Sequence, residues 1–273
     1  MKNLRLGQTN IVVSPLGLGT VKIGRNKKVK YPCGEDFPLP SNNKVEELLN
    51  VALSLGINVI DTAPAYGNSE ERLGSLLGNH RKDFVIISKA GEEFQNGLSY
   101  YDFSEKHIKL CVERSLKRLK TDYIECILVH SNRNDLYVLE NTPALETLSR
   151  FKERGDILSY GMSLYTVECG IKALESCDIL MVTYNLRDKS MYPVIERANK
   201  LNKGILVKKG LLSGHFSQSN HGSNLTDCIK EVFKVPGVHS LMVGSLNPEH
   251  LRQNVHILEN VLKWNQEKTV ETV

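Results

Sequence analysis

Eight short apolar segments recur along the chain, and each is followed by a stretch with the periodicity of a helix. The apolar segments cover residues 13–18, 57–60, 84–87, 124–129, 157–162, 179–182, 205–207 and 240–243. The segments expected to be helical cover residues 45–55, 70–77, 104–119, 144–151, 167–174, 192–201, 225–233 and 248–262. The strands are apolar nearly throughout, as expected when helices cover one face and a packed interior covers the other. Eight units in about 250 residues predict an α/β fold, a (β/α)8 TIM barrel.

A doubly wound sheet is the alternative fold. It would be expected to carry a glycine-rich GxGxxG motif after its first strand, whereas residues 16–20 read LGLGT. Residues 4–13 predict a small N-terminal β-hairpin with a Gly-containing turn, which we expect to close the barrel floor. No linker divides the chain, so we expect one domain over residues 1–273.

Composition excludes several classes of protein. Of 273 residues, 41% are hydrophobic and 24% charged, which excludes a disordered or low-complexity chain. A net charge of +4 is too small to indicate nucleic-acid binding. Six cysteines without a CxxC pair indicate a reducing compartment and no metal site. The chain shows no secretory signal and no membrane-length apolar run, so we expect a cytoplasmic protein.

Four ionisable residues follow neighbouring predicted strands. Asp61 follows the second strand, Tyr66 lies in the next turn, and Lys89 and His130 end the third and fourth strands. Each alone has an ordinary structural interpretation, such as a solvent-facing lysine, a turn tyrosine or a half-buried histidine. In a barrel, however, the carboxyl ends of the strands gather at one rim. The joint arrival of four such groups there predicts an active site.

The chemistry predicted for this rim is proton donation by a tuned phenol. A free tyrosine titrates near pH 10, too high for easy proton exchange at neutral pH. A nearby ammonium group such as that of Lys89 would lower the pKa of a phenol, and the carboxylate of Asp61 would hold the ammonium in place. His130 offers a second donor to a substrate oxygen. Such a site can protonate an oxygen on which negative charge develops, as carbonyl reduction by hydride requires.

Residues 61–63 (DTA) and 66–70 (YGNSE), followed by Lys89 and His130 at the next strand ends, resemble the aldo-keto reductase superfamily, in its short bacterial form. The resemblance extends from the N-terminal hairpin almost to the C-terminus. It implies that Tyr66 is the catalytic acid, that Lys89 and Asp61 tune it, and that His130 orients the carbonyl. The implied activity is reduction of small-molecule aldehydes or ketones with NADPH, or alternatively NADH, as cofactor.

The resemblance also implies which residues hold the cofactor. They are Ser163, Tyr184, Lys208, Lys209, Gly210, Leu211, Ser213, Gly214, Gly244, Ser245, His250, Arg252 and Asn254. Ser163 would hold the nicotinamide carboxamide, residues 208–214 would wrap the pyrophosphate, and residues 244–254 would surround the adenosine. Leu164 and Met181 stand where the family commonly has Asn and Gln. Arg252 would substitute for an arginine that relatives carry at the position of His250.

The substrate pocket is the least constrained part of the prediction. Residues 22–43 and 92–103 should flank it, the second segment with Phe94, Tyr100 and Tyr101. Little chain follows Trp264, which predicts an open, permissive pocket. We also expect a monomer or weak homo-oligomer. Two other functions stay open: a lyase that uses Lys89 as Schiff-base nucleophile, and a non-enzymatic NADPH-binding regulatory subunit.

Overall fold

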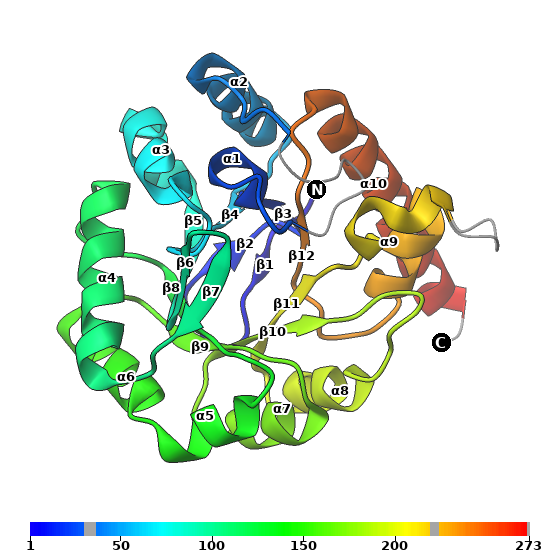
Figure 1. Ribbon diagram of the computed structural model, residues 1–273. Coiled ribbons are helices and arrows are strands. Elements are labelled where there is room, and N and C mark those ends of the chain that lie inside the picture. The colour runs from blue at the N-terminus through cyan, green and yellow to red at the C-terminus, as the bar shows by residue number, and fades with distance from the viewer. Residues whose placement is uncertain (30–36, 219–223, 272–273) are drawn as a thin grey trace.

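Eight parallel strands close into a barrel that a ring of helices surrounds (Figure 1). The computed structural model describes residues 1–29, 37–218 and 224–271, without the side chains of residues 216–218 and 265–271. Around the barrel, each strand is hydrogen-bonded to the next in the order β3, β4, β5, β8, β9, β10, β11, β12, and β12 returns to β3. The barrel strands are β3 (Leu16–Gly19), β4 (Val59–Asp61), β5 (Val85–Ala90), β8 (Cys126–His130), β9 (Tyr160–Ser163), β10 (Ile179–Thr183), β11 (Gly204–Lys208) and β12 (Ser240–Val243). The predicted (β/α)8 barrel is confirmed.

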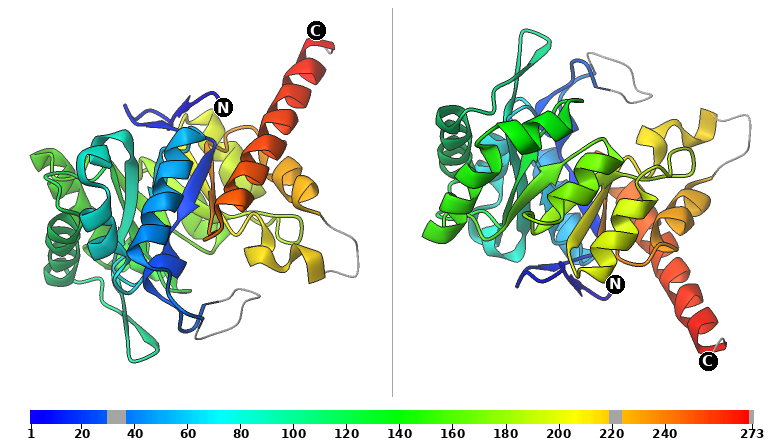
Figure 2. Two further views of the ribbon diagram at one scale, coloured as in Figure 1. Left: turned by 90° about the horizontal axis from the view of Figure 1, so that it is seen from above. Right: turned by 90° about the horizontal axis from the view of Figure 1, so that it is seen from below.

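The eight predicted helices lie at the expected places, with differences mainly at their ends, and two short helices over residues 21–24 and 135–141 were not predicted. They are α1 (Val21–Gly24), α2 (Asn42–Ser54), α3 (Ser69–Leu76), α4 (Glu105–Leu119), α5 (Asp135–Asn141), α6 (Ala144–Arg154), α7 (Val167–Ala173), α8 (Tyr192–Lys200), α9 (Leu225–Phe233) and α10 (Pro248–Glu271). Two 3-10 helices cover Gly78–Asp83 and Leu212–Gln218. Figure 2 shows α10 extending well beyond the barrel. No helix of the described ranges is long and apolar enough to span a bilayer.

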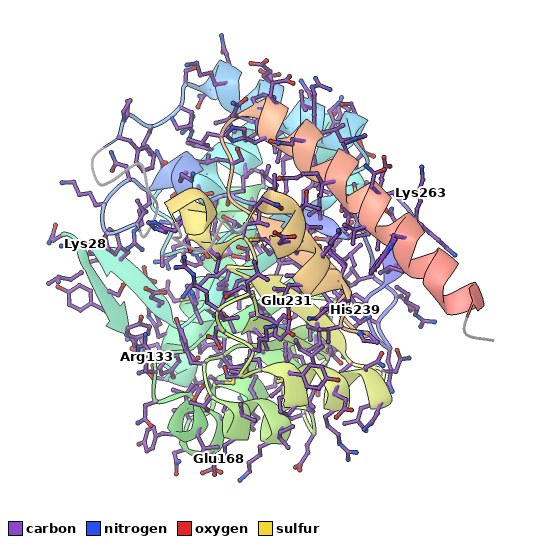
Figure 3. All side chains as sticks on the ribbon, turned by 90° about the vertical axis from the view of Figure 1, so that its right-hand side faces the viewer. Lys28, Arg133, Glu168, Glu231, His239 and Lys263 are labelled. Carbon is purple, nitrogen blue, oxygen red and sulfur yellow. The ribbon has the colours of Figure 1, made fainter. Side chains whose placement is uncertain are left out.

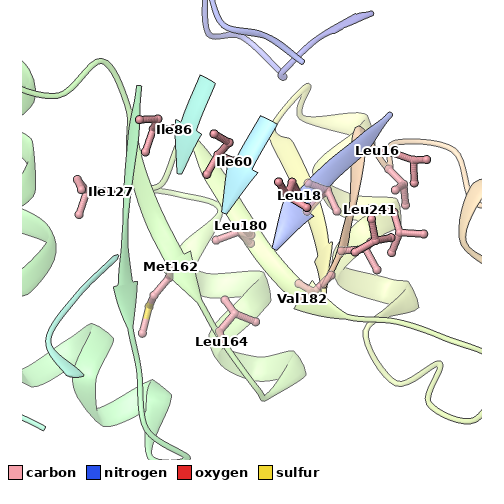
Figure 4. Packing of buried hydrophobic residues seen from close by; sticks show 14 of the residues in the cluster. Leu16, Leu18, Ile60, Ile86, Ile127, Met162, Leu164, Leu180, Val182 and Leu241 are labelled. Carbon is pink, nitrogen blue, oxygen red and sulfur yellow. The ribbon is translucent and has the colours of Figure 1, made fainter. Parts of the chain in front are cut away.

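Both faces of the barrel strands are buried. Figure 4 shows side chains from successive strands, among them Leu18, Ile60 and Ile127, in the layer between barrel and helices. A second cluster fills the barrel itself and consists of Leu6, Ile11, Val13, Val59, Ile87, Cys126, Leu128, Ile179, Met181, Leu206 and Met242. Double burial explains why the strands read as continuous apolar runs.

The N-terminal hairpin, β1 (Leu4–Arg5) paired with β2 (Val12–Val13), closes the barrel floor as predicted. Leu6 and Val13 are fully buried in the inner cluster. The turn approaches the start of β11 so closely that a Cβ on Gly7 would lie 2.4 Å from the backbone nitrogen of Gly204. With a φ of +59°, position 7 therefore requires glycine.

A second hairpin lies at the opposite end of the barrel from the first (Figure 2). It consists of β6 (Glu92–Gln95) and β7 (Leu98–Tyr101), where we expected an irregular segment. Asn96 and Gly97 at its tip have φ values of +52° and +81°, typical of the Asn-Gly turn that matches strand twist. This dipeptide was the sequence signal for the hairpin.

Candidate active site

The pleat of the barrel strands directs the predicted catalytic residues inward. Side chains alternate between the two faces of a strand, so a residue two positions after an inward-facing one also faces inward. The inner cluster includes Val59, Ile87, Leu128 and Leu206. The next inward positions on the same strands are Asp61, Lys89, His130 and Lys208. These four side chains therefore meet above the packed interior, at the carboxyl ends of their strands.

Lys89 and Asp61 form a buried ion pair between neighbouring strands. The Nζ of Lys89 lies 2.5 Å from Oδ1 of Asp61 and donates a second hydrogen bond, 2.8 Å long, to the carbonyl oxygen of Thr62. The Lys89 side chain is 1% exposed. Two fixed acceptors hold the ammonium group at one place on the rim.

Tyr66 and His130 lie beside this pair. The Nζ of Lys89 is 4.8 Å from the centre of the Tyr66 ring, and the Tyr66 and His130 rings meet edge to face with centres 6.2 Å apart. The four predicted catalytic residues are thus neighbours. A fifth group, which sequence reasoning missed, is Glu92 at the start of β6, whose Oε2 lies 2.7 Å from Nδ1 of His130.

A cavity of about 610 Å³ opens over these residues, within the size range of small-molecule sites. Its predicted lining residues are Asp61, Tyr66, His130, Lys208, Lys209, Leu211, Ser213, Gly214, Gly244, Ser245, His250 and Asn254. The lining also includes Lys22, Arg25, Lys28 and Val29 from the segment 22–43, which was expected to flank the pocket, and Gln253 from the segment expected at the adenosine. Sequence reasoning missed Gly19, Thr20, Val21, Tyr165, Leu225, Met242 and Val243. The lysine and arginine side chains among these residues make the cavity favourable for an anionic ligand, and the small residues leave backbone exposed.

Several residues expected at the cofactor do not line this cavity. Tyr184 is buried and its hydroxyl donates to Glu231. Gly210 packs against Leu241, and Arg252 pairs with Glu249 on the surface. These side chains are held by structural contacts that spacing along the chain does not reveal.

The two departures from the family pattern lie in the hydrophobic core. Leu164 is fully buried in the layer between barrel and helices, and Met181 is 1% exposed in the inner cluster. Neither side chain lines the cavity. Ser163 is also buried, and its hydroxyl accepts a 2.7 Å hydrogen bond from Nζ of Lys208.

Lys208 is a strongly perturbed cation of the cavity. Burial, followed by the charges of Lys209 and Lys89, lowers its pKa to about 7. Its Nζ also lies 4.5 Å from the centre of the Tyr165 ring. Tyr165 is itself held in place, because its backbone nitrogen donates to the buried carboxylate of Asp135 over 2.6 Å.

The segment after β11 has an unusual backbone. Lys209, Leu212 and Ser213 have φ values between +51° and +59°, and Gly214 has +87°. Left-handed residues other than glycine are uncommon and gather at ligand sites. Across the cavity, the chain after β12 passes through Gly244 to the start of α10 at Pro248.

The expected aromatic wall is placed differently. Tyr100 and Tyr101 on β7 are 51% and 41% exposed. The Phe94 ring packs under the guanidinium of Arg25, with its centre 3.3 Å from the Arg25 Cζ atom. None of the three lines the cavity. Arg25 lies between the hairpin and the cavity. The Tyr31-Pro32-Cys33-Gly34 part of the other expected wall falls outside the described residues.

One further cluster joins the β6–β7 hairpin to α4. Glu93, His107 and Cys111 bring three potential ligand atoms within 4.8 Å of one another. The guanidinium of Arg114 pairs with the Glu93 carboxylate and so balances its charge. Burial raises the pKa of the Cys111 thiol to about 11, so the thiol stays protonated. The cluster is therefore a structural ion-pair network.

A closed parallel barrel with a buried Lys–Asp pair, a tyrosine and a histidine beside a basic cavity defines a barrel enzyme. The model of the Aldo/keto reductase family matches residues 15–227, and the chain belongs to this family. It is an oxidoreductase of the kind that carries out NAD(P)H-dependent reduction of small carbonyl compounds.

Relatives span most of the chain. A protein from Pseudomonas aeruginosa, provisionally assigned as an aldo-keto reductase, has a solved structure that is 48% identical, with a TM-score of 0.86 over 95% of this chain and 96% of its own. The uncharacterized oxidoreductase YqkF of Bacillus subtilis is 28% identical over 93% of this chain and 90% of its own. The NADH-specific methylglyoxal reductase of Escherichia coli is 29% identical over 78% of this chain and 70% of its own.

Proposed function

We propose that this protein reduces aldehydes or ketones with Tyr66 as general acid and with NADPH as the preferred cofactor. The observation that carries the proposal is the buried ammonium of Lys89, fixed by Asp61 and 4.8 Å from the Tyr66 ring centre. A fixed positive charge favours the phenolate and so makes the phenol a better acid. When bound, the reduced nicotinamide supplies a hydride to the carbonyl carbon.

The chain's own residues then manage the charge on the substrate oxygen. As negative charge develops on that oxygen, the Tyr66 hydroxyl donates its proton to it, and the imidazole of His130 donates a hydrogen bond to the same atom. Donors positioned in advance around a developing oxyanion contribute strongly to catalysis. The resulting phenolate is stabilised by Lys89, which keeps its own protons in bonds to Asp61 and Thr62.

The cofactor fits the cavity through charge and shape. Lys208, Lys209 and the exposed backbone of Ser213 and Gly214 are proposed to hold the pyrophosphate. Ser245 and His250, whose Oγ and Nδ1 are 3.2 Å apart, are proposed to hold the 2′-phosphate. Arg252, engaged with Glu249, is not needed in this arrangement. The preference for NADPH rests on these contacts.

The nicotinamide amide requires another explanation, because Leu164 and Met181 point into the core. Ser163, which the family resemblance places at the amide, accepts a 2.7 Å hydrogen bond from Nζ of Lys208. We propose that the Ser163 hydroxyl takes over the role of the missing amide side chains.

The proposal is tested by following cofactor absorbance with 4-nitrobenzaldehyde and identifying the product. We expect the corresponding alcohol in a one-to-one ratio with oxidised NADPH, and a lower KM for NADPH than for NADH. Tight NADPH binding without oxidation over a broad panel of aldehydes and ketones would contradict the proposed reaction. Equal or better use of NADH would contradict only the cofactor preference.

A further inference from the structure

Glu92 brings a carboxylate to the catalytic rim from outside the barrel. It is the first residue of β6, beside the end of β5 (Figure 1), and is 8% exposed. Its Oε2 lies 2.7 Å from Nδ1 of His130, and its Oε1 accepts a 2.6 Å hydrogen bond from the Ser99 hydroxyl across the hairpin. Both carboxylate oxygens therefore have fixed partners.

The contact between Glu92 and His130 is an ion-pair contact. The Nδ1 of His130 is buried, and the ring N–H is not aligned with the carboxylate oxygen well enough to form a directed hydrogen bond. Both this short contact and the charge of Glu92 favour a doubly protonated, positively charged imidazole.

The other surroundings of His130 oppose that charge. Burial, above all, lowers the pKa of His130, and the cations of Lys89 on β5 and Lys208 on β11 lower it further. The Tyr66 and His130 rings meet edge to face. Glu92 is the group that opposes these effects and raises the pKa. Without Glu92, burial and the two cations would lower the pKa of His130 further.

Glu92 itself stays ionised. Burial acts against its charge, but His130, Ser99 and Arg25 together outweigh burial and lower its pKa to about 2. Tyr101, its partner across the hairpin, has a pKa raised to about 12 by burial and then by Glu92, so this phenol stays neutral. The neighbouring Tyr165 phenol also has a raised pKa, again chiefly through burial. Glu92 is thus charged and the two phenols are neutral around the His130 ring.

We propose that Glu92 is a positioning residue that holds the His130 ring with Nδ1 toward the carboxylate and Nε2 toward the cavity, and that it favours the doubly protonated imidazole, the form in which Nε2 donates to the substrate oxygen. The inference rests on the proposed function, in which His130 meets that oxygen. A charged donor forms roughly twice as strong a hydrogen bond to a developing oxyanion as a neutral one. The β6–β7 hairpin thus completes the electrostatics of a site built on barrel strands.

The direct test is an NMR titration of the histidine ring carbons in protein saturated with NADP⁺. Wild type is compared with Glu92→Gln, and His130→Asn assigns the His130 signal. We expect the His130 pKa to fall by one unit or more in Glu92→Gln, a tenfold loss of the protonated form at a given pH. The matched control is Glu93→Gln, which removes the adjacent carboxylate paired with Arg114 and should move the pKa by a few tenths at most.

Kinetics give the second readout. In Glu92→Gln we expect kcat/KM at neutral pH to fall tenfold or more, with the alkaline limb of its pH profile displaced downward by the same amount as the His130 pKa. Glu92→Asp, which keeps the charge, should recover part of the lost kcat/KM and part of the lost His130 pKa. An unchanged His130 titration in Glu92→Gln, whether or not the variant is less stable, would overturn the inference. If wild type reduces no carbonyl compound, the proposed function fails, and the titration still decides the link between Glu92 and His130.

Discussion

Asp61 and Lys89 form an ion pair of 2.5 Å whose side chains are 9% and 1% exposed. Removal of one partner from a buried pair leaves an unpaired charge away from water and costs about 3–5 kcal/mol. We therefore expect Lys89→Met to lower the free energy of unfolding by about that amount in denaturant titrations and to abolish turnover.

The double variant Asp61→Asn/Lys89→Met separates stability from chemistry. It removes both charges, so it should recover much of the lost free energy of unfolding. It should remain inactive, because no ammonium stabilises the Tyr66 phenolate. Recovery of activity together with stability would show that the pair has only a structural role.

Lys208 makes cofactor binding dependent on pH. Its pKa, lowered to about 7, means that the ammonium is mostly present at pH 6 and mostly lost at pH 8 in the free protein. An anionic cofactor favours the charged form, so binding should take up close to one proton at pH 8 and almost none at pH 6. Calorimetry in buffers of different ionisation enthalpy measures this uptake. The account fails for Lys208 if Lys208→Met takes up as many protons as wild type.

Ser245 and His250 give a test of cofactor choice. An aspartate at position 245 would place a carboxylate next to the proposed 2′-phosphate, so Ser245→Asp should raise the Kd for NADPH tenfold or more and leave the Kd for NADH within about twofold. His250→Arg should lower the ratio of the Kd for NADPH to the Kd for NADH, the opposite of the change expected for Ser245→Asp. Fluorescence titration with both cofactors provides the measurement. Equal effects on the two Kd values would place the phosphate elsewhere.

The barrel could be predicted from the sequence because double burial leaves an apolar run at every strand. The meeting of Asp61, Lys89 and His130 at one rim could be predicted as well, because each of them lies at the end of such a run. Once the parallel strands close into a barrel, their carboxyl ends lie at one rim. The place of Tyr66 at the same rim could be predicted because it lies in the short turn after Asp61. These predictions use only local pattern and topology.

Glu92 and Arg25 could not be predicted in the same way. Their roles depend on a hairpin that folds back over the rim, and the Asn96-Gly97 signal for that hairpin is only two residues long. Arg252 and Tyr184 were expected at the cofactor but pair with Glu249 and Glu231 instead. Such pairing depends on side-chain rotamers and on neighbouring side chains. Such side-chain competition leaves no periodic trace in the chain.

The central claim is that the phenol of Tyr66 supplies the proton. The most direct measurement is the single-turnover rate of hydride transfer from bound NADPH to 4-nitrobenzaldehyde in Tyr66→Phe, with Tyr165→Phe as the matched variant in the same cavity. General acid catalysis contributes about 10²–10⁴-fold, so the rate in Tyr66→Phe should fall by that factor, while Tyr165→Phe should stay within about tenfold of wild type. A rate in Tyr66→Phe equal to that of wild type would contradict the account.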